Sequence, residues 1–554
     1  MQRLILTLLA VLLVSGASAD FADYVYVAPG VTKTAPEATK EALLDSAVSS
    51  WLEREFPVLT YGTFAGQREV LKAYAAKEGP QQVAEGFGIQ VDADELVGEA
   101  FTEDGYTVTL GGVRSVDAEA IRLRADLIGF DDTDELWVID PTVSRAFGPF
   151  TADDAEADGT WLPTVMGDTV VLILRSTDGA IPPLQVELGA HFFADPASPK
   201  YDVCPIPAVC ESNTTVQEVS SGIGRIVLPA GSGGQYLCTG ALVNNPTTSA
   251  LEPLFLMANH CVDGIGLDAS GVEVYWDYRS TACAANTTGT VPSLATVPRS
   301  TGAFVLAEDS TVDGELIELR GDIPVGEYGR AWLGWDTRTP IVDDALMGIH
   351  HPQGKDMKLA AGHVTHVDQS YTASRIYQHV TRVIWDEGIT EGGSSGSPLL
   401  YRNLNCRILG MLSGGGVHNC ATPETNYDYY ASFRHFYGTY GGFFQDGPTA
   451  LQTAWVLVNN WNGIDANTDG AITYAEADAA LSFMNADLFA AVNVNGGSAI
   501  TASEAQAFLA KGGPGCHAAR TTRRANADVA VALAAAAILL LTSRRRTLPH
   551  HARR

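Results

Sequence analysis

The segment Glu391-Gly-Gly-Ser-Ser-Gly-Ser-Pro398 decides how the rest of this chain is interpreted. It has the form Gly-x-Ser-Gly-x-Pro, a glycine-rich turn that presents one serine hydroxyl beside backbone N–H groups. Such a serine needs a base to take its proton, and the base needs an acid that orients it and stabilises its charge. Upstream, His260 ends an apolar run as Ala-Asn-His-Cys, and Asp313 opens Asp-Gly-Glu-Leu-Ile-Glu-Leu. The chain order His, Asp, Ser predicts a nucleophilic triad.

Other segments fall in the same order around these residues, and together they resemble the chymotrypsin-like serine proteases, most closely the bacterial lysyl endopeptidases. The resemblance covers about residues 200–445 and implies two antiparallel Greek-key barrels with the active site between them. The segments that carry it are Cys204-x5-Cys210, 238–245, 259–261, 274–278, 313–319, 334–336, 349–352, 393–398 and 412–415.

The resemblance assigns roles to the residues that match. Ser395 is the nucleophile because it precedes glycine in Gly-x-Ser-Gly, and His260 is the general base. The N–H groups of Gly393 and Ser395 form the oxyanion hole. Asp313 is the favoured acid, with Asp309 as the local competitor.

Substrate selection is expected to differ from that of trypsin. The position six residues before the nucleophile is Ile389, which offers no charge, whereas Asp428-Tyr-Tyr matches the segment from which lysyl endopeptidases draw their acid. A carboxylate at the base of the pocket predicts cleavage after Lys or Arg. The remaining substrate-binding positions are Ser413, Gly414 and Gly415, and Ser413 stands where those enzymes carry a histidine.

Two further departures concern the same region. Ser394 stands where trypsin-like zymogens carry an aspartate, so activation by a salt bridge to a new N-terminus is excluded. His350 and His351 lie next to each other, but the family carries this turn without metal, so they are expected to be structural. No cofactor is expected for catalysis.

The chain has eight cysteines, which in an exported protein predict disulfides. Cys238–Cys261 would tie the Cys-Thr-Gly strand to the histidine loop. By resemblance, Cys210 pairs with Cys283, and Cys204 pairs with Cys420. Cys406 could compete for Cys420, and the sequence leaves that choice open.

The ends of the chain indicate export. Residues 1–19 form a short apolar segment after Arg3 that ends in Ala-Ser-Ala, a signal peptide, and residues 513–554 combine a Gly/Cys motif, a short apolar run and an arginine cluster. This tail resembles C-terminal sorting tails of Gram-negative bacteria, particularly myxobacteria, with a simple membrane anchor as the alternative. The formal net charge of −30 argues against nucleic-acid binding. We expect a secreted or cell-surface monomer acting on proteins or peptides, transiently attached through its tail.

The predicted fold is multidomain, with an all-β double Greek-key barrel core at 198–445, an α+β N-terminal region at 20–197 and a small α-helical EF-hand module at 446–512. The N-terminal region carries helical spacing at 36–56 and 67–88 and strand patterns at 106–110 and 169–174. It is expected to be a removable prodomain, or else a retained accessory domain. The Pro/Ser-containing stretch 195–200 is the expected cleavage junction.

The module contains one strong calcium-loop pattern, which also suits a dockerin-like pair. It provides oxygen ligands at loop positions 1, 3, 5, 7, 9 and 12, with Gly470 at the tight turn. A second loop at 493–504 lacks several of these groups and is expected to be a structural partner. The predicted calcium ligands are Asp465, Asn467, Asp469, Ala471, Thr473 and Glu476.

Together, these expectations predict a secreted, calcium-binding serine endopeptidase. The competing hypotheses are a catalytically inactive binding relative, a calcium-dependent assembly protein in which proteolysis is secondary, and an esterase. The last would be expected to show a nucleophile elbow between a strand and a helix, which this motif lacks.

Overall fold

The computed structural model describes residues 21–29, 41–43, 52–62, 81–193, 205–248, 250–263, 265–283, 291–373, 375–403, 405–416, 425–445 and 447–511. The chain divides into two compact units, one formed by residues 1–448 with 479–483, and one formed by 449–478 with 484–554. The predicted signal peptide at 1–19, the expected cleavage junction at 195–200 and the predicted tail at 513–554 lie outside the described residues. Within the described ranges, no helix is long and apolar enough to cross a membrane.

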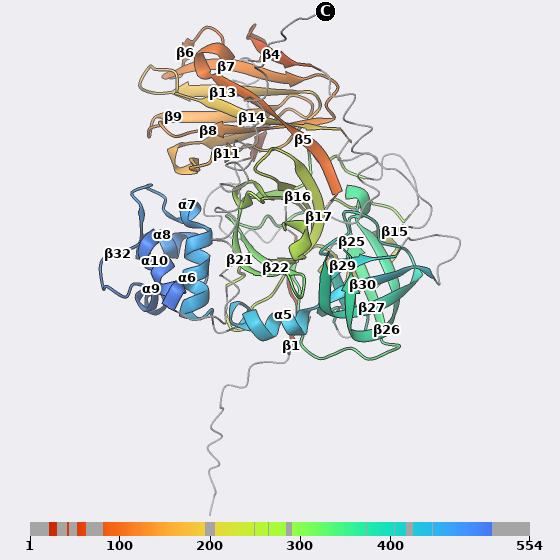
Figure 1. The fold of residues 1–554 in the computed structure, drawn as a ribbon. Coiled ribbons are helices and arrows are strands. Elements are labelled where there is room, and N and C mark those ends of the chain that lie inside the picture. Colours follow the sequence, from red (N-terminus) through yellow and green to blue (C-terminus); the bar gives the residue numbers. More distant parts are fainter. Residues whose placement is uncertain are drawn as a thin grey trace, which may run out of the picture. The chain divides into compact units, whose positions relative to one another are not determined.

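The N-terminal region is built from strands packed as two sheet layers (Figure 1). One layer has the order β3-β10-β9-β13-β7-β4, and β8, β14 and β5 belong to the other. The principal elements are β3 (Glu41–Leu43), β4 (Val58–Tyr61), β5 (Gln81–Asp92), α3 (Ala93–Leu96), β6 (Phe101–Glu103), β7 (Tyr106–Ser115), β8 (Ala120–Asp126), β9 (Asp134–Asp140), β10 (Arg145–Phe150), β11 (Thr160–Trp161), β12 (Val165–Met166), β13 (Thr169–Ser176) and β14 (Gln185–Phe192).

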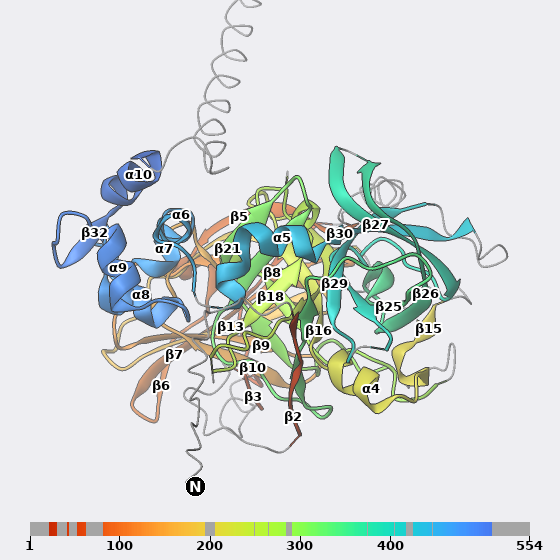
Figure 2. The same ribbon diagram turned by 90° about the horizontal axis from the view of Figure 1, so that it is seen from below.

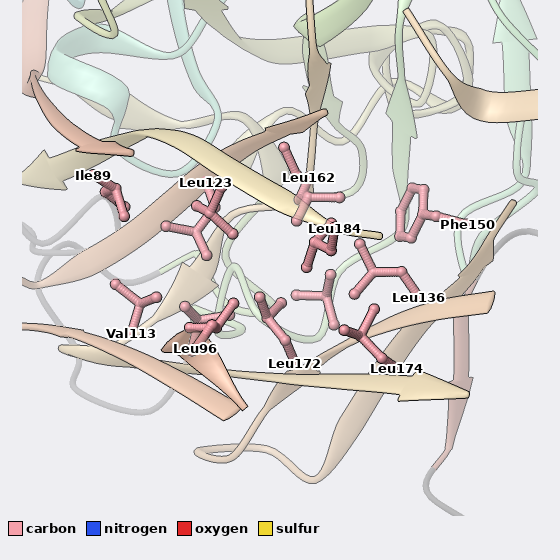
Figure 3. Close-up of a cluster of buried hydrophobic side chains, with 14 of the residues drawn as sticks. Ile89, Leu96, Val113, Leu123, Leu136, Phe150, Leu162, Leu172, Leu174 and Leu184 are labelled. Atoms are coloured by element: carbon pink, nitrogen blue, oxygen red, sulfur yellow. The ribbon is translucent and has the colours of Figure 1, made fainter. Parts of the chain in front are cut away.

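Aliphatic side chains from both layers meet in one core, in which Leu123, Leu172 and Leu184 converge (Figure 3). The strands expected at 106–110 and 169–174 are confirmed as β7 and β13. The helical expectation was wrong for 41–43 and for 81–88, which lie in β3 and β5. In β5 the apolar residues Val83, Phe87, Ile89 and Val91 are buried, and this period of two suits a strand.

The first barrel of the central region belongs to the same sheet as part of the N-terminal region. The strand order is β11-β8-β14-β5-β17-β16-β19-β20, so β5 runs beside β17 (Figure 1). Phe255 and Trp276 lie in the core of this barrel. Its elements are α4 (Thr214–Ser220), β16 (Ile223–Pro229), β17 (Gln235–Leu242), β18 (Leu254–Met257), β19 (Glu273–Tyr275), β20 (Arg299–Thr301), β21 (Ala303–Asp309) and β22 (Gly314–Leu319).

The second barrel is a separate sheet with the order β1-β24-β29-β28-β25-β26-β27-β30 (Figure 2). Its core contains Trp385 and Tyr430. The elements are β15 (Ile206–Pro207), β24 (Trp335–Asp336), β25 (Ala345–His350), β26 (Lys358–Thr372), β27 (Ile376–Glu387), β28 (Pro398–Tyr401), β29 (Ile408–Gly415), β30 (Tyr427–Ser432) and helix α5 (Phe433–Tyr440). The strand β23 (Arg330–Trp332) precedes them and forms a separate two-stranded sheet with an N-terminal strand. The all-β expectation for this region is confirmed, because both barrels are built from antiparallel strands with short helices between them.

Two short N-terminal strands join these barrels at their edges. β1 (Phe21–Ala22) pairs with β24, and β2 (Val25–Val27) pairs with β23. Gly334 faces this segment so closely that an added Cβ would lie 2.3 Å from the carbonyl oxygen of Ala22. The first described residues are therefore part of the barrel architecture, although they are far from it in sequence.

The second unit is a pair of helix–loop–helix segments. Its elements are α6 (Ala450–Asn459), α7 (Trp461–Ile464), β31 (Ala471–Thr473), α8 (Tyr474–Ala480), α9 (Ala486–Val492), β32 (Ala499–Thr501) and α10 (Ala502–Lys511). The two loops are joined by antiparallel pairing of β31 with β32, in which Ile472 lies opposite Ile500.

Candidate active site

His260 and Asp313 form a buried pair. The Nδ1 atom of His260 lies 2.8 Å from Oδ2 of Asp313, and the backbone N–H of His260 donates to Oδ1 of the same carboxylate at 2.8 Å. Asp313 is fully buried and His260 is 8% exposed. The carboxylate therefore orients the ring and leaves Nε2 as the nitrogen that can exchange a proton. Asp309 instead accepts hydrogen bonds from the N–H groups of Thr311 and Val312 within its own turn.

The turn that carries Ser395 follows β27 and leads into β28. Some of its backbone N–H groups are hydrogen-bonded within the protein and others are not. The N–H groups of Ser394, Gly396 and Ser397 donate to carbonyl oxygens at 2.9–3.0 Å. Among the described residues, the N–H groups of Gly393 and Ser395 donate to no protein acceptor. Gly393 has a φ of 88°, a left-handed conformation that favours glycine. Two free amides on one turn form a suitable site for a developing oxyanion.

The Ser395 turn packs against Thr239 on β17 and against Ala258, which follows β18 and lies two residues before His260. The N–H of Thr239 donates to the carbonyl of Ser395 at 2.8 Å, and its hydroxyl donates to the carbonyl of Gly393 at 2.9 Å. A Cβ added at Gly396 would lie 2.4 Å from the carbonyl oxygen of Thr239 and 2.9 Å from the backbone nitrogen of Ala258. Ser395 itself is partly exposed. Among the described residues, no hydrogen bond joins Ser395 to His260. Hydrogen bonds between a nucleophile and its base often tighten only when substrate is bound.

The two neighbouring histidines have different hydrogen-bond partners, and the partner of His350 lies in this turn. His350 Nδ1 lies 2.8 Å from the hydroxyl of Ser394, which also accepts from the N–H of Glu391 at 3.1 Å. His351 Nδ1 lies 3.0 Å from the carbonyl oxygen of Lys355, and burial lowers the pKa of His351 to about 3. His351 is therefore neutral. The sequence did not reveal that Ser394, in the place of the zymogen aspartate, is fixed by a buried histidine.

Asp428 is buried beside the proposed substrate-binding strand. It is 1% exposed and accepts hydrogen bonds through Oδ2 from Trp385 Nε1 at 2.5 Å and from the Thr390 hydroxyl at 2.6 Å. In the β29–β30 pairing, Gly415 lies opposite Asp428. A Cβ at Gly415 would lie 1.8 Å from Oδ1 of Asp428, so only glycine leaves this carboxylate in place.

The remaining substrate-binding positions also lie on β29. Ser413 is 6% exposed, and Gly414 lies opposite Tyr429 on β30. Gly414 is also close to Tyr371, because an added Cβ would lie 3.0 Å from the phenol oxygen. Together with Asp428, these residues place all four predicted substrate-binding positions on the paired strands β29 and β30.

Two groups beside the triad were missed from the sequence. The ring centroid of Tyr377 lies 6.4 Å from that of His260. The sequence places Tyr377 in a strand pattern, β27, but contains no other signal for this contact. Asn259 Nδ2 donates to Oε2 of Glu315 at 2.9 Å. Burial raises the pKa of Glu315 well above its ordinary value, which favours the neutral form of this carboxyl.

Two of the expected disulfides are present. Cys238–Cys261 and Cys210–Cys283 are both formed. Cys204 and Cys420 lie outside the described residues, so their pairing stays a prediction. Cys406 is a free, buried thiol, and burial raises its pKa to about 11.

The predicted calcium loop has a backbone that suits a cation. Gly470, at loop position 6, has a φ of 82°. Oδ2 of Asp465 accepts from the N–H of Gly470 at 3.0 Å, and Oδ1 of Asp469 accepts from the N–H of Ala471 at 2.9 Å. Glu476 accepts from both the N–H and the hydroxyl of Thr473 at 2.7 Å. The donor set fits Ca²⁺, which prefers oxygen ligands, and calcium binding stays a prediction.

The comparisons with known proteins fall on the region that carries this site. Residues 200–431 match the family model described as "Lysyl endopeptidase, C-terminal domain". A lysyl endopeptidase of Pseudomonas aeruginosa is 32% identical over 248 residues, which is 44% of this chain and 51% of that protein. The chain thus spans about half the length of this curated relative. The match supports a serine endopeptidase hydrolase.

Solved structures are similar at lower levels. The active form of the Rv3671c protease from M. tuberculosis is 16% identical, with a TM-score of 0.29, over 44% of this chain and 90% of that chain. The MamO protease domain from Magnetospirillum magneticum is 12% identical, with a TM-score of 0.26, over 40% of this chain and 96% of that chain.

Proposed function

We propose that this protein is a secreted serine endopeptidase that works through His260, Asp313 and Ser395. The observation that carries the proposal is the buried His260–Asp313 pair together with the two unused amides of Gly393 and Ser395. His260 Nε2 takes the proton of the Ser395 hydroxyl as the oxygen attacks the scissile carbonyl. The amides hold the oxyanion that develops. His260 then gives the proton to the leaving amine, and water hydrolyses the acyl-enzyme by the same steps.

The test is hydrolysis of an unfolded protein substrate by the wild type and by Ser395→Ala. The variant is expected to lose at least a thousandfold in kcat with its fold unchanged. Thr239→Val is a useful second variant, because it removes the hydroxyl that holds the Gly393 carbonyl while the triad is intact. A wild-type protein that hydrolyses no peptide bond, even after N-terminal processing, would favour a catalytically inactive binding relative.

We further propose that Asp428 selects Lys or Arg at the P1 position. Trp385 and Thr390 donate to one of its carboxylate oxygens, and the side chain is buried beside Gly415. A cationic side chain would supply the opposite charge that a buried carboxylate needs. The relative's name supports lysine. A peptide library should show cleavage after Lys or Arg, whereas cleavage after Leu or Phe that Asp428→Ser leaves unchanged would exclude this role.

We propose that activity follows removal of the N-terminal region at about residues 195–204. The proposal rests on Ser394, which offers no acid for zymogen-type pairing with a new N-terminus. N-terminal sequencing of the active form should find a start between Ala197 and Cys204. Full activity in a chain that still begins at Asp20 would contradict it.

A second candidate function is calcium-dependent attachment or assembly through residues 449–511. It is favoured by the paired loops, whose strands β31 and β32 join at Ile472 and Ile500. In this proposal Asp465, Asn467, Asp469, Thr473 and Glu476 hold Ca²⁺ with the carbonyl of Ala471. Deleting residues 447–512 discriminates between the two functions. If peptide hydrolysis persists while surface attachment is lost, the module localises the enzyme.

A further inference from the structure

A cluster of two histidines and an aspartate lies on the second barrel, separate from the triad. Asp368 on β26, His379 on β27 and His435 on α5 each offer one ligand atom, and these atoms lie within 4.8 Å of one another. The side chains of Asp368 and His379 are 59% and 38% exposed, and His435 is partly buried. Nothing in the proposed peptidase chemistry uses these residues.

The contacts inside the cluster leave one nitrogen of each ring for a ligand. His379 Nδ1 lies 2.6 Å from Oδ1 of Asp368, and His435 Nδ1 lies 3.0 Å from the hydroxyl of Ser432. The pairing of His435 uses Nδ1, so its Nε2 is available for a ligand. A metal ion held by Asp368 and His379 would replace the hydrogen bond between them.

The two imidazole rings are stacked with centroids 3.7 Å apart and an interplanar angle of 9°. Neutral rings tolerate this arrangement, whereas two imidazolium ions would repel each other. Arg434 is a nearby cation that acts against metal binding, and Asp368 offsets its charge. A surface ring can rotate to direct its Nε2 toward a shared ion on a short timescale.

The backbone at this place is unusual. Asp368 and His379 both adopt left-handed φ angles, 52° and 58°, where the β26–β27 register shifts between His366 and Gln369. Left-handed φ is uncommon for residues other than glycine. The bulge therefore turns both side chains out of the regular strand alternation and toward α5.

Both elements that meet at the cluster also hold the turn of Asp313. The N–H of Gln378, next to His379, donates to the carbonyl of Thr311 at 2.9 Å. Phe436, next to His435, packs so closely on Gly314 that an added Cβ there would lie 2.4 Å from its ring. An ion that joined His379 to His435 would clamp the β26–β27 hairpin to α5 on either side of this turn.

We propose that Asp368, His379 and His435 form a binding site for a divalent transition metal ion of the Zn²⁺ class, which stabilises the second barrel. Two imidazole nitrogens, one carboxylate oxygen and a water molecule complete the four-coordinate shell that Zn²⁺ prefers. The ligand set is too rich in nitrogen for Ca²⁺ or Mg²⁺. The site is independent of the oxygen-only loop at 465–476.

The test is calorimetric titration of the full chain with Zn²⁺ in saturating Ca²⁺, using Ser395→Ala to prevent autolysis. Ca²⁺ blocks the oxygen-only loop, and histidines elsewhere contribute equally to every variant. His379→Gln and His435→Gln should each weaken the assigned binding event at least tenfold and abolish the Zn²⁺-induced rise in Tm. His363→Gln is the matched control, because His363 pairs with Asp386 at 3.0 Å on the same hairpin and belongs to no such three-residue group within the described ranges.

Asp368→Asn provides a second, more exposed variant if either histidine variant fails to fold, and it should also weaken binding. Co²⁺ loaded in place of Zn²⁺ should give the visible absorption of a tetrahedral site, which the His435→Gln protein lacks. Equal Zn²⁺ affinity in all of these proteins would overturn the proposal. Because the titrated protein lacks the nucleophile, that result would leave the proposed peptidase activity untouched.

Discussion

At the scale of single residues, Asp428 is the sharpest test of specificity. We expect Asp428→Asn to lower kcat/KM for Lys and Arg substrates at least a hundredfold. The amide keeps the volume of the side chain and its contacts with Trp385 and Thr390 but offers no charge to a buried cation. Kinetics on matched Lys, Arg and Leu peptides measure the effect. Asp386→Asn on the exposed face of β27 is the control, and an equal loss in that variant would contradict the assignment.

Glu318 gives a prediction about pH. Burial raises the pKa of this side chain to about 7. In the unfolded chain the carboxyl ionises near its ordinary pKa of about 4.5, so folding stability falls as the pH rises from there to about 7 and stays lowered above. We expect Glu318→Gln to remove a loss on the order of 3 kcal/mol.

Thermal unfolding of the two proteins between pH 4 and pH 8 checks this prediction. The Tm of Glu318→Gln should match the wild type near pH 4 and exceed it increasingly toward pH 8. Parallel curves over the whole range would show that Glu318 ionises normally in the folded protein.

At the scale of elements, the N-terminal strands are the clearest departure from what the sequence indicated. β1 and β2 hold too few residues for a periodic pattern, and their pairing partners lie some three hundred positions away in the chain. Pairing over such a separation depends on tertiary contacts that local spacing does not encode. The helical expectation failed at 81–88 for a related reason, because alanines and glutamates suit a helix locally, whereas the buried alternation in β5 suits a sheet. The part of this expectation at 67–80 lies outside the described residues.

Deleting residues 21–27 should destabilise the barrels and leave the triad chemically intact. The deletion exposes the edges of β23 and β24 and uncovers Gly334, which lies in close contact with this segment. We expect the unprocessed chain to show a lower Tm and a lower yield of folded protein, with an unchanged kcat for the enzyme that is processed from it. Asp23→Ala removes the ion pair with Arg407 and leaves the strand in place. This variant should cost little, because the Asp23 side chain is 55% exposed and Arg407 keeps a second carboxylate partner in Asp336. An unchanged Tm in the deletion would contradict a structural role for these strands.

At the scale of the whole molecule, a buried ionic network links the N-terminal region to the first barrel. Glu273 accepts from the N–H and the hydroxyl of Thr164 at 3.0 and 2.7 Å and pairs with Arg299 at 3.3 Å. Burial acts to raise the pKa of Glu273, but Arg122, Arg299 and Thr164 outweigh it and lower the pKa to about 2. Its stabilising contribution is therefore complete above about pH 4.5 and is lost as the pH falls toward 2.

Thr164→Val should destabilise the protein by about 2 kcal/mol at pH 7, because the hydroxyl donates to a buried charge. The difference from the wild type should shrink as the pH falls toward 2, which thermal unfolding at several pH values measures. Thr169→Val is the control, since the hydroxyl of this threonine donates to its neighbour Asp168 at 2.8 Å and not to the buried Glu273. A loss that does not change with pH would show that Glu273 is not the group involved.

Much of the candidate site could be predicted, because each motif lies in one short segment whose chemistry is fixed by residue type. His260 pairs with Asp313, and the Ser395 turn packs against Ala258, two residues before His260, while the catalytic roles of these residues stay predictions. The support around them was not predictable, since the contacts of His350 with Ser394 and of Tyr377 with His260 join segments with no shared pattern.

The central claim is that Ser395 is a nucleophile activated by His260 and Asp313. Its most direct test is labelling of the processed protein with a fluorophosphonate, followed by mass spectrometry of the modified peptide. We predict one adduct on Ser395, absent in Ser395→Ala and slowed at least a thousandfold in His260→Ala. No adduct in a folded wild-type protein, or an adduct on another serine that survives Ser395→Ala, would contradict the claim.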